Sequence, residues 1–405
     1  MAITARATTR RQKEVNSHNG FPRYTDQEMT RRFTLAREAM DAAGVEAIVM
    51  AGATTGLETA ISYFSNWSPL VESYLILPRD REPVLFARLW NHMPDARLIS
   101  AVEDVRYGGD SPVHQAKYVA SALREFGLAK AGLGIVGPLR AADFDILSKE
   151  LPDASWQDLN APYREMRLVK SDEEMVYMRI ASEFNDRSIA AMQEQIRPGM
   201  REYEINRIIE DVYLAERGTN LIHFTMSTSM AAPDRCVPHQ QQPDRVIREG
   251  DAIVTEISTT FWGYAGQILR SFTVAAEPTP LYRDLFDTAT AAYDAITVRL
   301  RAGVTVGEIL DAAEVIDGSG FTIFDDLVHG QGGAYLPPII RTRQERGASH
   351  PEEYAYPSGS VIVVQPNVIT SDGTAGVQLG NALRITDDGA ELLQEAPMGF
   401  LRCEA

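Results

Sequence analysis

The first part of the chain alternates short apolar runs with amphipathic segments. The hydroxyl of Thr25 and the carboxylate of Glu28 have the form of a capping box, and Phe33, Ala36 and Met40 follow at helical spacing. Further apolar runs bounded by turn residues predict strands over residues 46–51, 74–78, 83–86 and 131–136, with a helix over 113–126. Strands interleaved with helices in this way predict an α/β domain with a mixed, helix-covered sheet.

A second domain is expected to begin near residue 165. Ser171 and Glu174 again have the form of a capping box, and Met175, Met178 and Ala181 continue with helical spacing. Another amphipathic helix is predicted over residues 202–217. We therefore expect a flexible N-terminal leader over residues 1–24, the α/β domain over 25–165 and a second domain over 166–405.

The second domain contains an internal repeat. Residues 196–199, Ile-Arg-Pro-Gly, precede the helix that carries Glu204, and residues 300–303, Leu-Arg-Ala-Gly, precede at the same offset a segment that carries Glu308. Each half then reaches a strand that begins with a glycine, Gly250 in the first half and Gly359 in the second. Two such pairs in the same order predict an α+β domain built from two similar halves.

Composition and charge narrow the range of partners. The chain has 405 residues, of which 44% are hydrophobic and 23% charged, which suits two globular domains. Its net charge of −17 disfavours nucleic acid and anionic membrane surfaces as partners. There are two cysteines and neither a secretory signal nor a membrane span is visible, so we expect reduced thiols and a cytoplasmic protein.

Three residues of the second domain are candidates for acid–base chemistry. His239 lies beside a turn just ahead of a predicted buried strand, and His329 lies in a glycine-rich segment that a ligand could approach closely. Either histidine could instead be a loop residue bonded to a carbonyl. Glu256 lies within an apolar run, where a carboxylate must be paired or functional. A hairpin is expected to bring Gln267 and Arg270 back beside Glu256.

The order of several motifs resembles the pita-bread fold of methionine aminopeptidase, prolidase, aminopeptidase P and creatinase. The motifs are Gly250-Asp251, Glu256, Gly263-Tyr264, Arg270-Ser271-Phe272, His329-Gly330-Gln331-Gly332, Gln365-Pro366 and Gly376-Val377. The resemblance covers nearly the whole chain. It implies a creatinase-type N-terminal α/β domain followed by an α+β pita-bread catalytic domain with pseudo-two-fold halves.

The same resemblance identifies the positions of the metal ligands. Peptidases of this fold hold two divalent ions with two Asp, one His and two Glu. Laid onto this chain, those positions carry Glu256, Gln267, His329, Gln365 and Gly380. A dinuclear site needs several anionic oxygens to offset its charge, which neutral glutamines and a glycine cannot supply. We therefore predict no metal and no other cofactor.

Loss of the metal site favours a hydrolase that acts without metal. The chain then resembles creatinase and ectoine hydrolase, and it is expected to hydrolyse a C–N bond of an amide, an amidine or guanidine, or a cyclic analogue in a small polar molecule. His239 precedes Gly250 by the spacing of the creatinase catalytic histidine. Three alternatives stay open: a metal-free C–N or C–S lyase, a non-catalytic binding module, and a metal-dependent Xaa-Pro peptidase.

Roles for individual residues follow from this interpretation. His239 is predicted to be the general acid and base. Glu256 is expected to orient His239, bind a cationic nitrogen or activate water. His329 and Gln365 are expected to hold the substrate or its oxyanion. The residues predicted to bind substrate are Gln267, Gln365, Arg341, Tyr335, Trp67 and Glu72.

Two of these residues belong to the N-terminal domain. In creatinase a loop of this domain reaches into the neighbouring subunit's site and carries an arginine for the substrate carboxylate. The matching loop here, residues 66–74, has no arginine and carries Glu72, which suggests a substrate with a cationic or hydrogen-bonding group. Trp67 would pack on such a group or at a subunit interface. The resemblance implies a homodimer in which each N-terminal domain caps the partner's site.

Overall fold

The computed structural model describes residues 15–53, 59–333 and 335–404, and the chain divides into two compact units. The first unit ends at Arg167 and the second begins at Leu168, close to the expected boundary at residue 165. Of the leader expected over residues 1–24, residues 1–14 lie outside the described residues. The remainder forms a short antiparallel pair, β1 (Ser17–His18) and β2 (Phe21–Pro22).

The first unit is built on a mixed sheet with the strand order β6-β5-β4-β3-β7-β8. Its strands are β3 (Ala47–Gly52), β4 (Ser73–Pro78), β5 (Val84–Ala87), β6 (Asp104–Tyr107), β7 (Gly132–Val136) and β8 (Ser155–Asp158). β3, β4 and β5 pair antiparallel, and the pairs β3–β7, β5–β6 and β7–β8 are parallel. The strands predicted from the apolar runs are thus confirmed, with small shifts at their ends.

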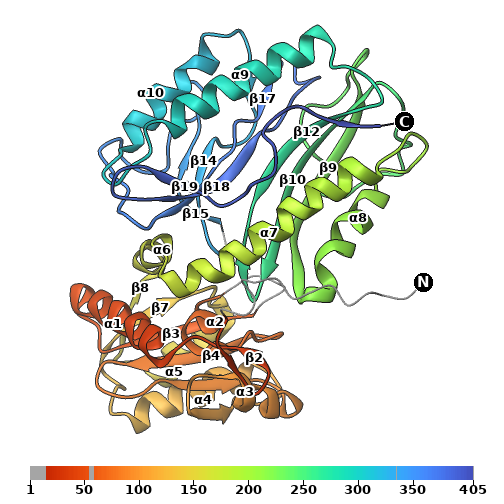
Figure 1. Ribbon diagram of the computed structural model, residues 1–405. Coiled ribbons are helices and arrows are strands. Elements are labelled where there is room, and N and C mark those ends of the chain that lie inside the picture. The colour runs from red at the N-terminus through yellow and green to blue at the C-terminus, as the bar shows by residue number, and fades with distance from the viewer. Residues whose placement is uncertain (1–14, 54–58, 334, 405) are drawn as a thin grey trace. The chain divides into compact units, whose positions relative to one another are not determined.

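Helices cover both faces of this sheet (Figure 1). They are α1 (Asp26–Ala43), α2 (Ala60–Ser65), α3 (Met93–Ile99), α4 (Pro112–Glu125), α5 (Ala141–Glu150) and α6 (Asn160–Leu168), with a 3-10 turn at Trp90–His92. Successive residues of β3 alternate between two cores. Ile48 and Met50 pack with α1, α2 and α3, whereas Ala47 and Val49 pack with α4 and α5.

The second unit repeats a pair of helices followed by strands. The first half contains α7 (Asp172–Gln195), α8 (Glu204–Tyr213) and a 3-10 turn (Leu214–Glu216), and the second contains α9 (Pro280–Thr297) and α10 (Val306–Asp317). The two turn motifs predicted as a repeat separate α7 from α8 and α9 from α10. Their last residues, Gly199 and Gly303, have φ angles of 95° and 85°, which glycine adopts without strain. The predicted two-half repeat is therefore confirmed.

The strands of both halves join in one sheet, ten-stranded in the described part of the chain. Its main order is β11-β10-β12-β18-β16-β14-β15, with β9 beside β10, β19 beside β18 and β20 beside β12. The strands are β9 (Gly218–Ser229), β10 (Asp251–Phe261), β11 (Tyr264–Ala265), β12 (Ile268–Val274), β14 (Val328–Gln331), β15 (Tyr335–Ile340), β16 (Val361–Val364), β18 (Gly380–Ile385), β19 (Ala390–Leu392) and β20 (Leu401–Cys403). A separate short pair joins β13 (Thr322–Ile323) to β17 (Val368–Ile369).

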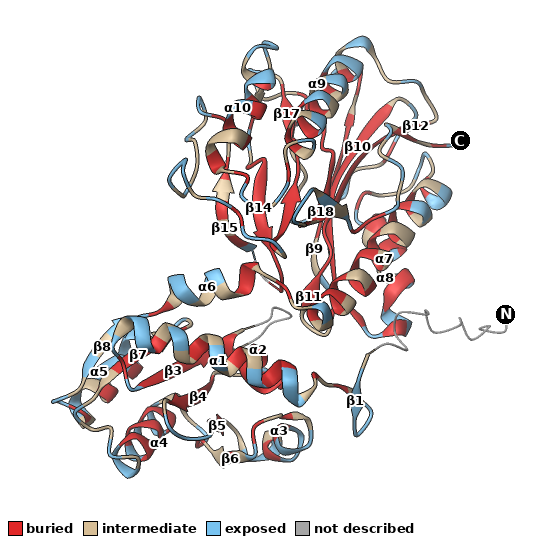
Figure 2. Cartoon of the chain, turned by 60° about the vertical axis from the view of Figure 1, so that its left-hand side comes forward, coloured by how far each residue is buried: buried red, intermediate tan, exposed pale blue. Residues whose placement is uncertain are grey.

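Helices flank the large sheet and leave its strands buried. α7 packs on β10, β12 and β20, and α9 packs on β16 and β17. Figure 2 shows β10, β14 and β18 coloured as buried for most of their length, while the outer turns of α9 are exposed. A polar side chain on these strands therefore lies away from bulk water unless it faces a binding site.

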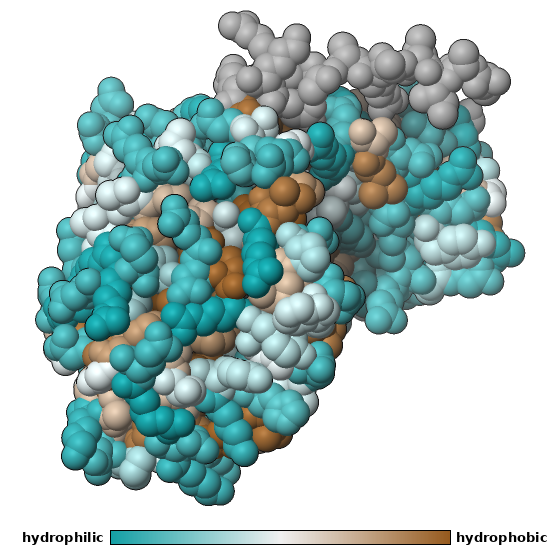
Figure 3. Space-filling view, turned by 90° about the horizontal axis from the view of Figure 1, so that it is seen from below, coloured by the Kyte–Doolittle hydropathy of each residue, from teal (hydrophilic) through white to brown (hydrophobic). Residues whose placement is uncertain are grey.

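The face drawn in Figure 3 is mainly hydrophilic, as the acidic composition suggests. Figure 3 shows one face on which hydrophilic residues dominate and apolar residues form small scattered groups. No helix in the described ranges has the length and apolar character needed to cross a bilayer. Cys236 and Cys403 are both buried and free of disulfides, as the sequence predicts.

Candidate active site

Glu256 lies in the middle of β10, with β9 and β12 hydrogen-bonded on either side. The residue is 9% exposed. Gln267, just before β12, donates a hydrogen bond from Nε2 to Oε1 of Glu256 at 3.0 Å. The predicted hairpin is therefore confirmed for Gln267, and a buried carboxyl group receives the hydrogen bond that burial demands.

Arg270 does not join this pair. It lies an odd number of residues after Gln267 along the hairpin, and side chains of a strand alternate between the two faces of the sheet. Its buried guanidinium donates to the backbone carbonyls of Ala396 and Pro397 at 2.8 and 2.7 Å. The prediction that Arg270 lies beside Glu256 is corrected: the arginine ties the C-terminal segment to the sheet.

A hydrogen-bonded chain leads from Glu256 to the second half of the unit. Nε2 of Gln267 also donates to Oε1 of Gln365 at 2.8 Å, and Nε2 of Gln365 lies 3.4 Å from Oδ2 of Asp326. Gln365 directly follows β16, and its backbone N–H donates to the carbonyl of Leu327 at 2.8 Å. The two halves thus meet through side-chain amides whose N–H groups all point toward oxygen atoms.

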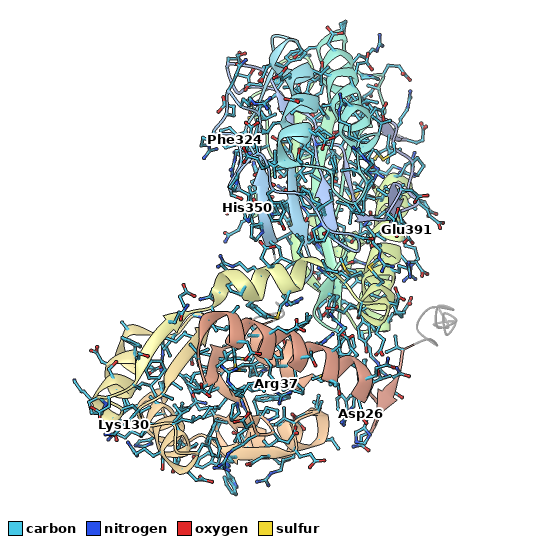
Figure 4. The ribbon with its side chains drawn as sticks, turned by 90° about the vertical axis from the view of Figure 1, so that its left-hand side faces the viewer. Asp26, Arg37, Lys130, Phe324, His350 and Glu391 are labelled. Atoms are coloured by element: carbon cyan, nitrogen blue, oxygen red, sulfur yellow. The ribbon has the colours of Figure 1, made fainter. Side chains whose placement is uncertain are left out.

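Two acidic residues of this cluster were missed by the sequence reasoning. Phe324 is exposed at the edge of the unit (Figure 4), and the chain then turns inward through Asp325 to the buried Asp326. Oδ1 of Asp326 accepts from the hydroxyl of Tyr335 at 2.8 Å, and its carbonyl accepts from Nδ2 of Asn367 at 2.7 Å. An acidic doublet just before a buried strand is the signal that could have identified both residues.

His329 lies on β14 with only 1% of its surface exposed. Its Nδ1–H donates to the carbonyl of Gly330 at 2.8 Å, and the imidazole also hydrogen-bonds Gln365. The ring lies 4.5 Å from the ring of Tyr335, centroid to centroid. Burial lowers the pKa of His329, so the neutral ring with its proton on Nδ1 is the resting form.

Two carboxyl groups of the cluster, those of Glu256 and Asp326, have pKa values well above their usual range. Burial raises the pKa of Glu256 to about 8, and the nearby charges of Asp325 and Asp326 add to the shift. Burial also raises the pKa of Asp326 to about 8, reinforced by its hydrogen bond with Asp325. Near neutral pH these groups are therefore protonated for much of the time, and the cluster carries less negative charge than its composition suggests.

These residues do not fit a pair of divalent ions. Within the described residues, no group of three or more His, Cys, Asp or Glu side chains is placed to hold a metal ion. Where anionic ligands would be needed, Gln267 and Gln365 present amides, and the N–H groups of Gln267 point at oxygen atoms of Glu256 and Gln365. The chemistry of this donor set therefore does not match a dinuclear site.

Gly380 leaves no room for a ligand side chain. A Cβ added there would lie 2.6 Å from the carbonyl oxygen of Val364 and 2.8 Å from Cα of Gln365. Both atoms belong to the backbone of the adjacent strand region and cannot move away cheaply. The position that the resemblance assigns to the fifth metal ligand is thus closed by packing as well as lacking a side chain.

We expect Gly380→Ala to lower the free energy of unfolding by about 1–3 kcal/mol, because the added methyl group overpacks the sheet. Gly389→Ala is the matched control, since a methyl group added there would lie 3.9 Å from its nearest neighbour, Oγ1 of Thr386. Urea unfolding of the two variants measures the difference. Equal stabilities would show that the strands around Gly380 can separate to admit a side chain.

His239 lies near a different carboxylate from the one predicted. Its backbone N–H donates to the carbonyl of Thr225 at 3.0 Å, which places it beside β9. Nδ1 lies 3.6 Å from Oε1 of Glu202, and no hydrogen bond or ion pair joins His239 to Glu256 within the described residues. The orientation of His239 by Glu256 is therefore not seen. Nothing in the local sequence pattern distinguishes Glu202 from an ordinary acid near a helix start.

Two buried donors near His329 have no hydrogen-bond acceptor in the described structure. They are Nε2 of Gln331, on the same face of β14 as His329, and Nε of Arg341, which follows β15. The charge of Arg341 acts on Tyr335 and partly opposes the upward shift of its pKa, so these residues lie near one another. Unpaired buried donors are costly, and an ordered water or a ligand can supply the acceptor atoms.

Trp67 and Glu72 belong to the first unit. Trp67 is 5% exposed and forms part of the apolar core there, so packing in this core explains why the ring is buried. Glu72 forms salt bridges with Arg88 at 2.7 Å and Arg140 at 3.7 Å. Its charge is therefore already balanced, which weakens the inference of a cationic substrate group. The substrate contacts of Trp67 and Glu72 stay predictions.

Comparison with known proteins places these observations in a family. The model of metallopeptidase family M24 matches residues 176–387. An uncharacterised hydrolase/peptidase of Sinorhizobium fredii is 25% identical over 391 residues, which cover 93% of this chain and 96% of the relative. The Xaa-Pro dipeptidase of Pyrococcus furiosus is 24% identical over 346 residues, which cover 84% of this chain and 92% of that protein.

Solved structures with similar folds extend over both units. The prolidase from Thermococcus sibiricus has a TM-score of 0.80 at 18% identity, covering 94% of this chain and 100% of that one. The X-Pro aminopeptidase from Thermotoga maritima has a TM-score of 0.78 at 20% identity, covering 92% and 99%. The predicted fold class, an N-terminal α/β domain followed by a pita-bread domain, is confirmed.

Proposed function

The chain belongs to metallopeptidase family M24, and from this premise we propose that it hydrolyses a C–N bond in a small polar molecule with side chains in place of metal ions. The observation that carries the proposal is the amide of Gln267. Its Nε2 donates at once to Glu256 and to Gln365, at 3.0 and 2.8 Å. A side-chain amide thus joins two oxygens at positions that the resemblance assigns to metal ligands.

The relatives favour a second candidate, a metal-dependent Xaa-Pro peptidase. The matching family is one of metallopeptidases, and the named relatives include Xaa-Pro dipeptidases. The comparisons therefore support this alternative better than the metal-free hydrolase, whereas the donor set of this chain supports the hydrolase. Sequence identities near 25% leave room for a changed reaction on a shared fold.

The proposed hydrolysis uses three kinds of group. His239 takes a proton from water at Nε2 while the water oxygen bonds to the substrate carbon, and it then delivers that proton to the leaving nitrogen as the C–N bond breaks. Glu256, whose pKa is raised to about 8, donates a hydrogen bond in its neutral form. Arg341 has an unpaired buried Nε–H, which suits an acceptor such as a substrate carboxylate.

The oxyanion role predicted for His329 and Gln365 stays a prediction. Nδ1–H of His329 already donates to the carbonyl of Gly330, and the imidazole also hydrogen-bonds Gln365. A developing oxyanion needs donors. Nε2 of Gln331, which has no acceptor among the described residues, is a further candidate donor for that role.

We expect the activity to survive removal of divalent ions. Exhaustive dialysis against a chelator should change kcat by less than about two-fold, because no step of the proposed reaction uses a metal ion. Hydrolysis in ¹⁸O-labelled water should place the label in the carbonyl product. The substrate is first identified by thermal shift with guanidino acids, N-acyl amino acids, betaines and cyclic amidines, since a ligand of the native state raises Tm.

The other outcomes separate the remaining alternatives. Activity on an Xaa-Pro dipeptide that is lost with the chelator and restored by Mn²⁺ would establish the peptidase. Product without ¹⁸O would indicate a lyase, and ligand binding without turnover would indicate a binding module. The homodimer with shared sites, the cytoplasmic location and the lack of nucleic acid partners stay predictions of the sequence.

A further inference from the structure

Glu202 is a fully buried carboxylate just ahead of α8. Its Oε2 accepts two hydrogen bonds from Ser227, one from the backbone N–H at 2.7 Å and one from the hydroxyl at 2.8 Å. Its Oε1 is buried and has no hydrogen-bond partner in the described structure. Leaving one oxygen of a buried carboxylate unbonded is costly, so a donor is expected to face it.

The group that faces Oε1 is the imidazole of His239, with Nδ1 at 3.6 Å. This distance is slightly longer than a hydrogen bond, and a small rotation of either side chain closes it. The loop around His239 is held by two contacts of its backbone, from its own N–H to Thr225 at 3.0 Å and from Gln242 Nε2 to its carbonyl at 3.4 Å. The ring therefore has a defined position beside the carboxylate.

The other ring nitrogen is also unpaired. Nε2 of His239 is buried and has no hydrogen-bond partner among the described residues, although the side chain as a whole keeps 19% exposure. A neutral imidazole carries one N–H and one acceptor nitrogen. With the proton on Nδ1, the ring satisfies Glu202 and presents a free lone pair at Nε2. With the proton on Nε2, two acceptors would face each other.

The charges around the pair are consistent with this tautomer. Arg245 donates to the hydroxyl of Ser227 at 2.6 Å and pairs with Asp251 at 2.6 Å, which holds the Ser227 hydroxyl toward Glu202. Burial raises the pKa of Glu202, and the Ser227 hydrogen bonds and Arg245 oppose that shift. Burial, and then the charge of nearby Arg235, lower the pKa of His239, so its resting form is neutral.

We infer that Glu202 is a positioning residue that fixes the proton of His239 on Nδ1, so that Nε2 is the base that takes the proton from the attacking water. The inference rests on the proposed function, because it takes His239 as the acid and base. The proton removed from water passes to Nε2 and then to the leaving nitrogen, while Oε1 of Glu202 faces Nδ1 throughout. The carboxylate thereby stabilises the transient imidazolium.

The tautomer can be read directly by ¹⁵N NMR of protein labelled at histidine. We expect Nδ1 of His239 to be protonated and Nε2 to be unprotonated in the wild-type protein at a pH where the ring is neutral. His239→Gln removes the resonances and assigns them. In Glu202→Gln, we expect the population to move toward the Nε2–H tautomer and kcat to fall by about 10–100-fold. Glu202→Asp should keep the Nδ1–H tautomer and recover part of kcat.

Glu204→Gln is the matched control. Glu204 carries the same charge two residues further along the chain, and its Oε2 accepts from the backbone N–H of Arg201 rather than from a histidine. We expect this variant to keep the wild-type tautomer and turnover. A fall in kcat in Glu202→Gln without a change of tautomer would indicate a merely structural role and overturn the inference.

The wild-type spectrum tests the inference even if Glu202→Gln does not fold. An Nε2–H tautomer of His239 in the wild-type protein overturns it, while the proposed function survives if His239 variants are inactive. If His239→Gln keeps wild-type turnover, the acid–base assignment in the proposed function fails, and the catalytic role of Glu202 fails with it. The NMR spectrum thus tests the role of Glu202, and the turnover of His239→Gln tests the acid–base role in the proposed function.

Discussion

Replacing His239 with alanine is expected to lower kcat for the C–N substrate by about 10²–10⁴-fold, the usual effect of removing a positioned acid–base group. Folding should be little affected, because the side chain forms no hydrogen bond with any residue that the structure describes and is 19% exposed. KM should change less than kcat, since the proton transfer occurs only in the chemical step. Steady-state kinetics on the identified substrate measure both constants.

His114→Ala is the control for the loss of a histidine. His114 is an exposed residue of α4 in the first unit and belongs to no cluster described above. We expect its kcat to equal that of the wild-type protein. If His239→Ala retains more than about a tenth of wild-type turnover, the acid–base role moves to the next candidate, His329.

The second large effect is the contribution of Glu256 to the pH dependence of the free energy of unfolding. Its pKa is raised from 4.5 to about 8 in the folded protein, so between these values the folded state holds a proton that the unfolded state has lost. The free energy of unfolding must therefore fall as pH rises through this window. Below about pH 4.5 both states are protonated, and the contribution no longer changes with pH.

Glu256→Gln removes this contribution and should flatten the pH profile. A shift of this size corresponds to about 5 kcal/mol across the window, and Asp326 contributes in the same direction because its pKa is also raised to about 8. We therefore expect Glu256→Gln to lose roughly half of the slope and the double variant with Asp326→Asn to lose most of it. Urea unfolding between pH 5 and pH 9 supplies the profiles.

Glu194→Gln, a change on the outer face of α7, is expected to keep the wild-type slope. The amide of glutamine can keep the hydrogen bond from Gln267, so a loss of stability at all pH values is not expected for Glu256→Gln. Identical slopes for wild type and Glu256→Gln would mean that the carboxyl group titrates normally. The raised pKa assigned to Glu256 would then be wrong.

Much of the fold was predictable because it depends on local patterns. Capping residues, helical spacing and bounded apolar runs identified the main elements of the first unit, and repeated turn glycines identified the two halves of the second. The glutamines at two positions that the resemblance assigns to metal ligands were also readable, because Gln267 and Gln365 occupy motif positions along the chain. These features depend on residue type and spacing alone.

One expectation from the local pattern was wrong. Gln267 and Arg270 were both expected beside Glu256, although residues an odd number apart along a strand point to opposite faces. Applying the two-residue period to the hairpin would have excluded Arg270. The structure instead places its guanidinium on backbone carbonyls of the C-terminal segment, including Ala396.

By itself, the sequence determined the element order, the two-half plan and the types of residue at the motif positions, because spacing and side-chain chemistry are local properties. Only the tertiary structure decided that Glu202 faces His239 and that hydrogen bonds lead from Glu256 through two glutamines to Asp326. It also decided that the backbone of a neighbouring strand leaves no room for a side chain at position 380. These contacts join residues far apart in sequence, and the raised pKa of Glu256 depends on burial and nearby charge. Burial and through-space distance exist only once the sheet has assembled.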